Sequence, residues 1–225
     1  MILAGRVRVD GVTTLKAAHE VHNDALLEIT PDDNDRFVSR GGLKLAGALQ
    51  QVTLNIAGMN CLDVGQSTGG FTDCLLQAGV QHVVGVDVGH GQLHPRLASD
   101  QRVTAIEGIN CRTLTADDLG TAFPPNGFDL IVGDLSFISL TLILPQLPAL
   151  LAPNSNMLLL VKPQFEVGPE NIGKGGIVRN PTLYGSVERK LRQCAHDHKL
   201  TVKSWLSSPI TGGDGNHEFF IWLGK

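Results

Sequence analysis

The sequence contains two lysines and two carboxylates beside apolar segments that give no reason for a polar side chain at those positions. Three of them flank apolar runs with the composition of buried strands, and the fourth lies on a segment with helical apolar spacing. A single lysine at a strand end is ordinarily a solvated terminus, but several polar side chains at converging strand ends indicate a catalytic cluster. The members of this candidate cluster are Lys44, Asp134, Lys162 and Glu218.

A cluster of this composition suits the removal of a proton from an alcohol. A hydroxyl is a poor nucleophile at neutral pH, so a base must take its proton as the new bond forms. Lys162 can be that base if burial and a neighbouring cation, Lys44, lower its pKa. Asp134 and Glu218 would then orient the two amines. With an activated donor, much of the remaining catalysis would be in-line positioning.

A glycine-rich turn follows the first strongly apolar strand, with the sequence Asp63-Val64-Gly65-Gln66-Ser67-Thr68-Gly69-Gly70. Glycines allow the backbone to approach a nucleotide-type ligand closely. A dinucleotide fingerprint would read G-x-G-x-x-G, but Ser67 replaces its middle glycine. The Asp63 carboxylate would repel a pyrophosphate, whereas it suits the amino group of a methionine moiety. The turn therefore favours S-adenosyl-L-methionine over NAD, and a glycine turn without a ligand is the alternative.

Residues after the next two strands extend the predicted cofactor site. Asp87 stands 22 positions beyond Gly65, where an acidic residue commonly accepts hydrogen bonds from ribose hydroxyls. NAD enzymes share this feature, so it indicates an adenosine-type ligand without choosing between the two. Glu107 and Asn110 could flank the adenine, although a simple loop explains them nearly as well. The residues expected to contact the cofactor are Asp63, Gly65, Ser67, Thr68, Gly69, Gly70, Phe71, Asp87, Glu107, Asn110 and Asp134.

Alternating strands and helices must position these residues. The expected elements are a helix at 45–52, then strands at 60–64, 83–88, 103–106, 128–135 and 157–161, helices at 70–78, 92–99, 139–151 and 181–198, and two closing strands at 201–206 and 219–223. This order predicts an α/β fold with a doubly wound, mostly parallel, seven-stranded Rossmann-like sheet. Its ligands should lie at the carboxyl ends of the strands, where the strand order reverses.

The first 29 residues form a separate predicted unit. Residues 7–12 are expected to be a short strand closed by an Asp-Gly turn, and residues 25–29 a second strand. Residues 30–38 are expected to be a linker, and residues 39–225 the main domain. About thirty residues bury little core on their own, so this unit should lean on another partner or be incomplete.

Composition and charge restrict the function class. No apolar run approaches the roughly 18 residues that cross a bilayer, and the N-terminus lacks a signal-peptide pattern. The four cysteines form no C-x-x-C pair, so we expect a reduced, cytoplasmic protein without a metal site. Residues 60–135 hold nine acidic and three basic side chains, and residues 171–203 hold seven basic and two acidic ones. The basic segment could hold a phosphate backbone, or it could be a solvated helix face.

Five motifs spread over essentially the whole chain belong together: Ser39-Arg40-Gly41-Gly42-Leu43-Lys44-Leu45, Asp63-Val64-Gly65-x-Ser67-Thr68-Gly69-Gly70-Phe71-Thr72-Asp73, Asp134-Leu135-Ser136-Phe137-Ile138-Ser139-Leu140, Val161-Lys162-Pro163-Gln164-Phe165-Glu166 and Gly215-Asn216-x-Glu218. They resemble the hemolysin A (TlyA) family, part of the FtsJ-like group of ribosomal RNA 2′-O-methyltransferases. The resemblance implies an S-adenosyl-L-methionine-dependent enzyme whose partners are ribosomal RNA or ribosomal subunits. It also implies a Lys-Asp-Lys-Glu catalytic tetrad, which falls on Lys44, Asp134, Lys162 and Glu218.

The same family usually begins with a small RNA-binding module. Residues 1–29 resemble only the second half of that module, so we expect a truncated one here. This expectation leaves open a non-catalytic RNA-binding or ribosome-assembly factor that retains the fold. The family name also suggests membrane lysis, but the sequence contains neither a transmembrane run nor an obvious long amphipathic basic helix that would support it. An NAD-dependent oxidoreductase is disfavoured by Ser67.

Overall fold

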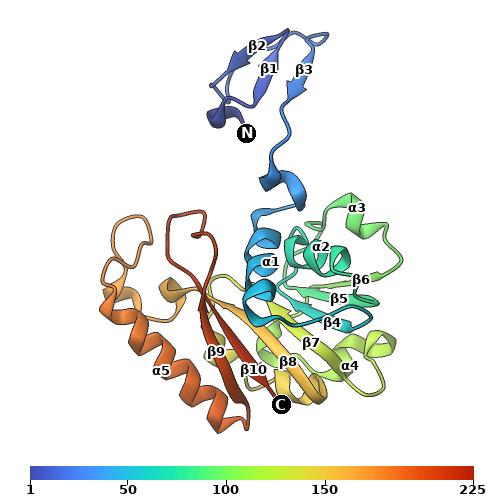
Figure 1. Cartoon of the computed structure of the whole chain (residues 1–225), viewed down its shortest axis with the longest axis vertical. Coiled ribbons are helices and arrows are strands. Elements are labelled where there is room, and N and C mark those ends of the chain that lie inside the picture. The colour runs from blue at the N-terminus through green and yellow to red at the C-terminus, as the bar shows by residue number, and fades with distance from the viewer. The chain divides into compact units, whose positions relative to one another are not determined.

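The computed structural model describes the backbone of residues 1–225 and the side chains of residues 1–32 and 35–225. The chain divides into two compact units, residues 1–36 and residues 37–225 (Figure 1). The smaller unit is an antiparallel sheet in the order β2-β1-β3, formed by β1 (Val7–Val9), β2 (Val12–Thr14) and β3 (Leu27–Ile29). Every described side chain of residues 1–36 is half-buried or exposed, so this sheet has no core of its own.

The larger unit is built on one seven-stranded sheet, which confirms the predicted α/β fold (Figure 1). Its strand order is β6-β5-β4-β7-β8-β10-β9. The strands from β4 to β8 are parallel, and β10 is antiparallel to both of its neighbours. The strands are β4 (Asn60–Val64), β5 (His82–Asp87), β6 (Val103–Glu107), β7 (Phe128–Gly133), β8 (Leu151–Val161), β9 (Thr201–Ser207) and β10 (Phe219–Gly224).

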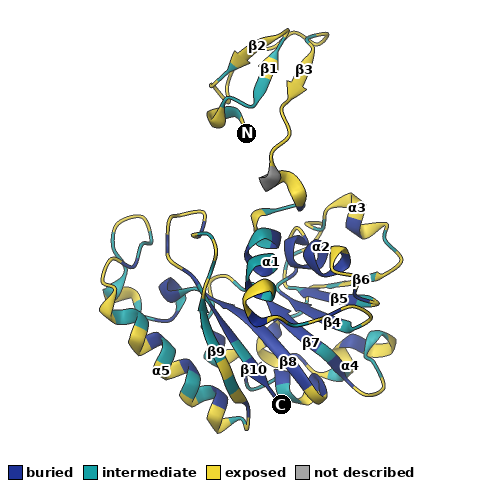
Figure 2. Cartoon of the chain, viewed as in Figure 1, coloured by how far each residue is buried: buried dark blue, intermediate teal, exposed yellow. Residues whose placement is uncertain are grey.

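Helices cover both faces of this sheet, so its central strands are buried on both sides (Figure 2). Successive side chains of a strand point to opposite faces, and Cys61 and Leu62 on β4 accordingly belong to two different apolar clusters. One cluster contains residues of α1, α2 and α3, and the other residues of α4 and α5. The α-helices are α1 (Arg40–Val52), α2 (Gly70–Gln77), α3 (Pro95–Ala98), α4 (Ala116–Leu119) and α5 (Thr182–Asp197).

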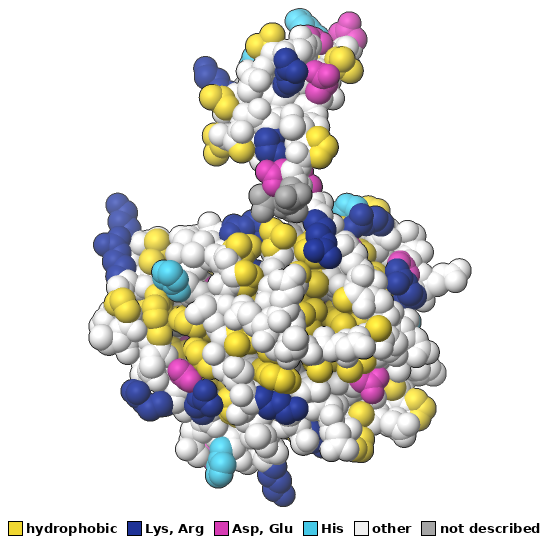
Figure 3. All heavy atoms as spheres, viewed as in Figure 1, with side chains coloured by type: hydrophobic (Ala, Val, Ile, Leu, Met, Phe, Trp, Pro, Cys, Tyr) yellow, Lys and Arg dark blue, Asp and Glu magenta, His cyan; other side chains and the backbone are white. Residues whose placement is uncertain are grey.

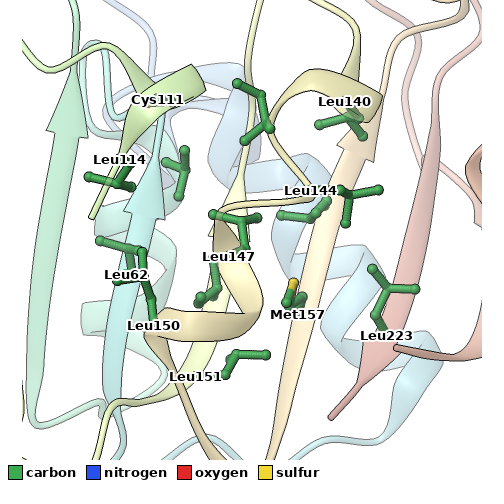
Figure 4. Packing of buried hydrophobic residues seen from close by; sticks show 14 of the residues in the cluster. Leu62, Cys111, Leu114, Leu140, Leu144, Leu147, Leu150, Leu151, Met157 and Leu223 are labelled. Atoms are coloured by element: carbon green, nitrogen blue, oxygen red, sulfur yellow. The ribbon is translucent and has the colours of Figure 1, made fainter. Parts of the chain in front are cut away.

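The predicted helix at 139–151 is wrong. The segment holds two short 3-10 turns, Leu140–Leu142 and Leu147–Leu150, and β8 begins directly afterwards. Pro145 and Pro148 explain the difference, because each lacks the N–H that an α-helix interior needs and clashes with the preceding turn. The apolar spacing was nevertheless meaningful, since the leucines of this segment pack against the sheet in the core (Figure 4), namely Leu140, Leu144, Leu147 and Leu150.

The strand order reverses beside β4. The chain proceeds from β4 outward through β5 to β6 and then returns to β7 on the other side of β4. The carboxyl ends of β4 and β7 therefore meet at the switch point, where ligands bind in folds of this type. Because β10 runs antiparallel, with Phe219 opposite Val161, its first residue lies at the same edge of the sheet. This register brings the segment before β10 next to the segment after β8.

Candidate active site

The four residues of the predicted catalytic cluster form two ion pairs at this edge. Lys44 Nζ, from α1, lies 2.5 Å from Glu218 Oε2, directly before β10. Lys162 Nζ, directly after β8, lies 2.7 Å from Asp134 Oδ1, directly after β7. Lys162 Nζ also donates a hydrogen bond to Ser136 Oγ at 2.7 Å. Four separate segments of the chain are thus brought together as the strand-end prediction requires.

The Lys44–Glu218 pair is the more deeply buried of the two. The Glu218 side chain is 2% exposed and that of Lys44 is 9% exposed. Burial raises the pKa of the Glu218 carboxyl above its usual range, while the hydrogen bond and charge of Lys44 oppose that rise. A buried charge is tolerated when it has a partner of opposite charge, and Lys44 and Glu218 meet this condition.

Three cavities meet at the cluster. The lysine cavity, of about 410 Å³, is lined mainly by Lys44, Phe137, Lys162, Gln164, Phe165, Asp214 and Glu218. The turn cavity, of about 140 Å³, is lined by Gly65, Ser67, Thr68, Gly70, Phe71, Asp134 and Lys162, with Ser39, Gly41 and Gln66 beside them. The crevice, of about 450 Å³, is lined by residues that include Asp87, Val88, Ile109, Asn110 and Asp134. Ser136 lines all three, so the Lys162–Asp134 pair stands at their junction.

The glycine turn passes close to the end of β7. Gly65 has a φ of 84°, and a Cβ atom placed on it would lie 3.0 Å from the backbone oxygen of Asp134. Gly69 has a φ of 91°, and its Cβ would lie 2.4 Å from the Leu97 side chain. Both positions combine a left-handed backbone with close packing, so only glycine fits without strain. Gly65 also lines both the turn cavity and the crevice.

Asp87 forms one wall of the crevice. Its Oδ2 accepts the Ser67 N–H at 2.8 Å, and its Oδ1 accepts the Gly89 N–H at 2.7 Å. Each carboxylate oxygen has two acceptor sites, so the group retains capacity for two hydroxyl donors. Asn110 lies in the same crevice, and its Oδ1 accepts the Arg112 N–H at 3.1 Å.

Three predicted cofactor residues lie outside the lining of these cavities. Asp63 is fully buried beneath the turn, where its Oδ2 accepts a hydrogen bond from Thr72 Oγ1 at 2.7 Å. Burial raises the pKa of Asp63 to about 7, and the charges of Asp134 and Asp87 act in the same direction. Glu107 Oε1 accepts the Gly91 N–H at 2.8 Å, and Gly69 packs against α3. The carboxylate that faces the turn cavity is that of Asp134.

Ser136, Phe137, Gln164 and Asp214 line the lysine cavity although the sequence did not single them out. Phe137 is the most unusual, because it is 91% exposed, has a φ of 63° and places its ring 5.3 Å from that of Phe165. An apolar residue at the mouth of a cavity on a left-handed backbone is a sign of function. The sequence offered one indication of this role, since Phe137 lies three residues after Asp134 in a segment already marked by polar residues.

The basic segment at residues 171–203 comprises the loop before α5, the helix itself and the start of β9. Part of its charge is paired, since Arg192 lies 2.7 Å from Glu188 and Lys190 lies 2.9 Å from Glu166. Figure 3 shows Lys and Arg side chains as separate groups on the visible face of the larger unit. Phosphate binding by this segment stays a prediction.

The described residues lack two further kinds of feature. No group of three or more His, Cys, Asp or Glu side chains among them could hold a metal ion. None of the helices in the described part of the chain is long and apolar enough to span a membrane.

Comparison with known proteins agrees with the motifs. The family model of FtsJ-like methyltransferases matches residues 37–225. The 16S/23S rRNA (cytidine-2'-O)-methyltransferase TlyA of Mycobacterium tuberculosis is 43% identical over 227 residues, which cover 99% of this chain and 81% of that protein. A solved structure from Streptococcus thermophilus is 40% identical with a TM-score of 0.85, covering 100% of this chain and 80% of the other.

A more distant match shows the fold alone. The S-adenosylmethionine dependent methyltransferase from Mesorhizobium loti is 13% identical with a TM-score of 0.60, and the match covers 80% of this chain and 96% of that one. The family model and the close relatives confirm the resemblance drawn from the five motifs. This chain belongs to the FtsJ-like methyltransferase family, in the group that includes TlyA.

Proposed function

We propose that this protein transfers a methyl group from S-adenosyl-L-methionine to a ribose 2′-hydroxyl of ribosomal RNA. The observation that carries the proposal is the convergence of Lys44, Asp134, Lys162 and Glu218 where the three cavities meet. The activity in the name of the M. tuberculosis relative, methylation of a cytidine 2′-oxygen in rRNA, supports the choice of acceptor.

The crevice and the turn cavity together suit the cofactor. Asp87 would accept the ribose hydroxyls, Asn110 would flank the adenine, and Asp134 would face the methionine amino group. The close-packed glycine turn, in which a Cβ on Gly65 would reach the Asp134 backbone oxygen, leaves room for the ligand beside the backbone. Asp63 would act indirectly in this arrangement, because its hydrogen bond to Thr72 holds α2 against the end of β4. Glu107 would similarly support the loop at Gly91.

The lysine cavity suits the acceptor nucleotide. When bound, the cofactor supplies a methyl group that its sulfonium already activates. In its neutral form, Lys162 would take the proton of the 2′-hydroxyl as the oxygen–methyl bond forms and the methyl–sulfur bond of the donor breaks, leaving a thioether, and that proton would later pass to solvent. Its bonds to Asp134 and Ser136 hold Nζ at the junction of the cavities. Lys44, paired with Glu218, contributes positive charge beside the oxygen that loses its proton.

The exposed ring of Phe137 offers a further contact to RNA. Unpaired bases stack on aromatic side chains, which is the usual mode of recognition in single-stranded RNA. Phe137 lines both the lysine cavity and the crevice, so a base stacked there would bring its own ribose close to Lys162.

The test is the transfer of a labelled methyl group from the cofactor to ribosomal subunits prepared from cells without the gene. Lys162→Ala should abolish incorporation while calorimetry shows unchanged cofactor affinity. Arg102→Ala is the matched control, because Arg102 is an exposed cation directly before β6, at the amino-terminal edge of the parallel strands and away from the cluster. Unchanged incorporation in Lys162→Ala would remove that residue from its role, and no cofactor binding at millimolar concentration would favour a non-catalytic RNA-binding factor.

A further inference from the structure

Glu166 is a buried carboxylate four residues beyond Lys162, at the end of the motif that begins at Val161. The function proposed above gives a role to Lys162 but none to Glu166. Its side chain is 1% exposed. Its oxygens accept three hydrogen bonds, from Ser139 Oγ at 2.6 Å, from Leu140 N at 2.7 Å and from Lys190 Nζ at 2.9 Å. Since hydrogen bonds to an ionised group are the stronger kind, this carboxylate is firmly held.

Glu166 and two of its partners, Ser139 and Leu140, lie on two segments of the chain that both begin at the candidate catalytic cluster. Residues 134–140 follow β7, and residues 162–166 follow β8; we call these segments the two-loop wall. The Asp134–Lys162 ion pair joins the segments at one end, and Glu166 joins them at the other end through Ser139 and Leu140. Between these links the rings of Phe137 and Phe165 lie 5.3 Å apart. The wall lines the lysine cavity from both segments.

We propose that Glu166 is a positioning residue for methyl transfer, acting through the two-loop wall on Lys162 and Asp134. The inference rests on the proposed function. The Asp134–Lys162 pair is partly exposed, with side chains 22% and 11% exposed, and an exposed pair alone fixes geometry weakly. The buried end at Glu166 is what sets the register of the two segments. Misplacement of a reacting group by about 1 Å can cost on the order of a hundredfold in rate.

Lys190 allows the positioning role to be separated from a link to α5. The Lys190 side chain is 44% exposed, so its removal leaves Glu166 with both wall contacts. Glu166→Gln keeps the side-chain volume but removes the charge. The amide nitrogen of glutamine cannot accept a hydrogen bond, so the substituted side chain cannot accept from Ser139, Leu140 and Lys190 as the two carboxylate oxygens do. Lys190→Met should therefore be much milder than Glu166→Gln if the wall is what matters.

The experiment combines kinetics with amide hydrogen exchange on the full chain. Glu166→Gln should lower kcat about tenfold, whereas cofactor affinity and KM for ribosomal subunits stay within about threefold. Exchange should rise in residues 134–142 and 162–168 and stay unchanged in α1 and α2. Glu188→Gln, which breaks an exposed pair with Arg192 on α5, should match the wild type in all of these measurements.

Two results would overturn the inference. One is a Glu166→Gln protein with wild-type kcat and wild-type exchange in the wall. The other is a parallel loss of kcat, cofactor affinity and exchange protection over the whole domain, which would mean a general loss of folded structure. If the wild-type chain transfers no methyl group at all, the proposed function fails, and the exchange measurement alone decides whether Glu166 fixes the wall.

Discussion

Gly65→Ala tests whether the glycine turn is shaped for a ligand. The position has a φ of 84°, and the added Cβ would lie 3.0 Å from the Asp134 backbone oxygen and 3.3 Å from the Leu135 side chain. The chain contains a matched control in Gly58, which has a φ of 77° but no atom within 4 Å of its added Cβ.

The two substitutions separate backbone strain from close contact. A non-glycine residue in the left-handed region costs about 1–2 kcal/mol, and both variants should lose this much free energy of unfolding. Gly65→Ala must in addition move the turn away from the end of β7 by a few tenths of an ångström. That displacement moves Gly65, which lines both the turn cavity and the crevice. We therefore expect cofactor affinity to fall at least tenfold, which corresponds to about 1.4 kcal/mol of binding free energy.

Calorimetric titration with S-adenosyl-L-methionine and denaturant unfolding of both variants measure these quantities. Gly58→Ala should bind the cofactor like the wild type despite its lower stability. If Gly65→Ala binds with wild-type affinity and is destabilised only as much as Gly58→Ala, the turn is not a ligand cradle.

Three further predictions concern charge, pH and the RNA side of the site. Lys44→Met leaves Glu218 buried without its cation and should cost about 3–5 kcal/mol in urea unfolding, much of which Glu218→Gln in the same chain should restore; an additive double variant would contradict the buried pair. Because the folded-state pKa of Asp63 is raised to about 7, the folded chain binds more protons than the unfolded chain between pH 4 and 7, so the free energy of unfolding should fall as pH rises through that window. Asp63→Asn should flatten that slope in unfolding measured at several pH values, and an unchanged slope would mean that another group titrates. Phe137→Ala should leave stability within about 0.5 kcal/mol but lower kcat/KM for ribosomal subunits about tenfold or more, and a wild-type kcat/KM would exclude base stacking there.

The sheet was predictable because its strands are buried on both faces. Such strands are continuous apolar runs, and the runs around Leu62, Val84, Ile131 and Leu159 are strands in the structure. The prediction of a helix at 139–151 was wrong because it gave the apolar spacing more weight than the two prolines. The leucines that produce this spacing do pack against the sheet.

The candidate catalytic cluster was partly predictable for a different reason. Polar residues after parallel strands lie at one edge of the sheet, which is enough to bring Asp134 and Lys162 together. The pairing of Lys44 with Glu218 depends on β10 being inserted between β8 and β9, and local sequence does not encode that order.

Asp63 shows the limit of the same reasoning at the cofactor turn. It occupies the strand position just before the last one, and its side chain points to the face covered by α2, where Thr72 meets it. The sequence places this carboxylate near the turn, but only the face of the strand decides whether it contacts the ligand.

The position of the transferred methyl group is the most direct test of the central claim. Ribosomal RNA labelled by the wild-type chain and then hydrolysed in alkali should release the label in dinucleotides, because a 2′-O-methyl group blocks cleavage of the next bond. Lys162→Ala should release none. Label recovered in mononucleotides would place the methyl group on a base, and that result would contradict the assignment of Lys162 as the base that activates a ribose hydroxyl.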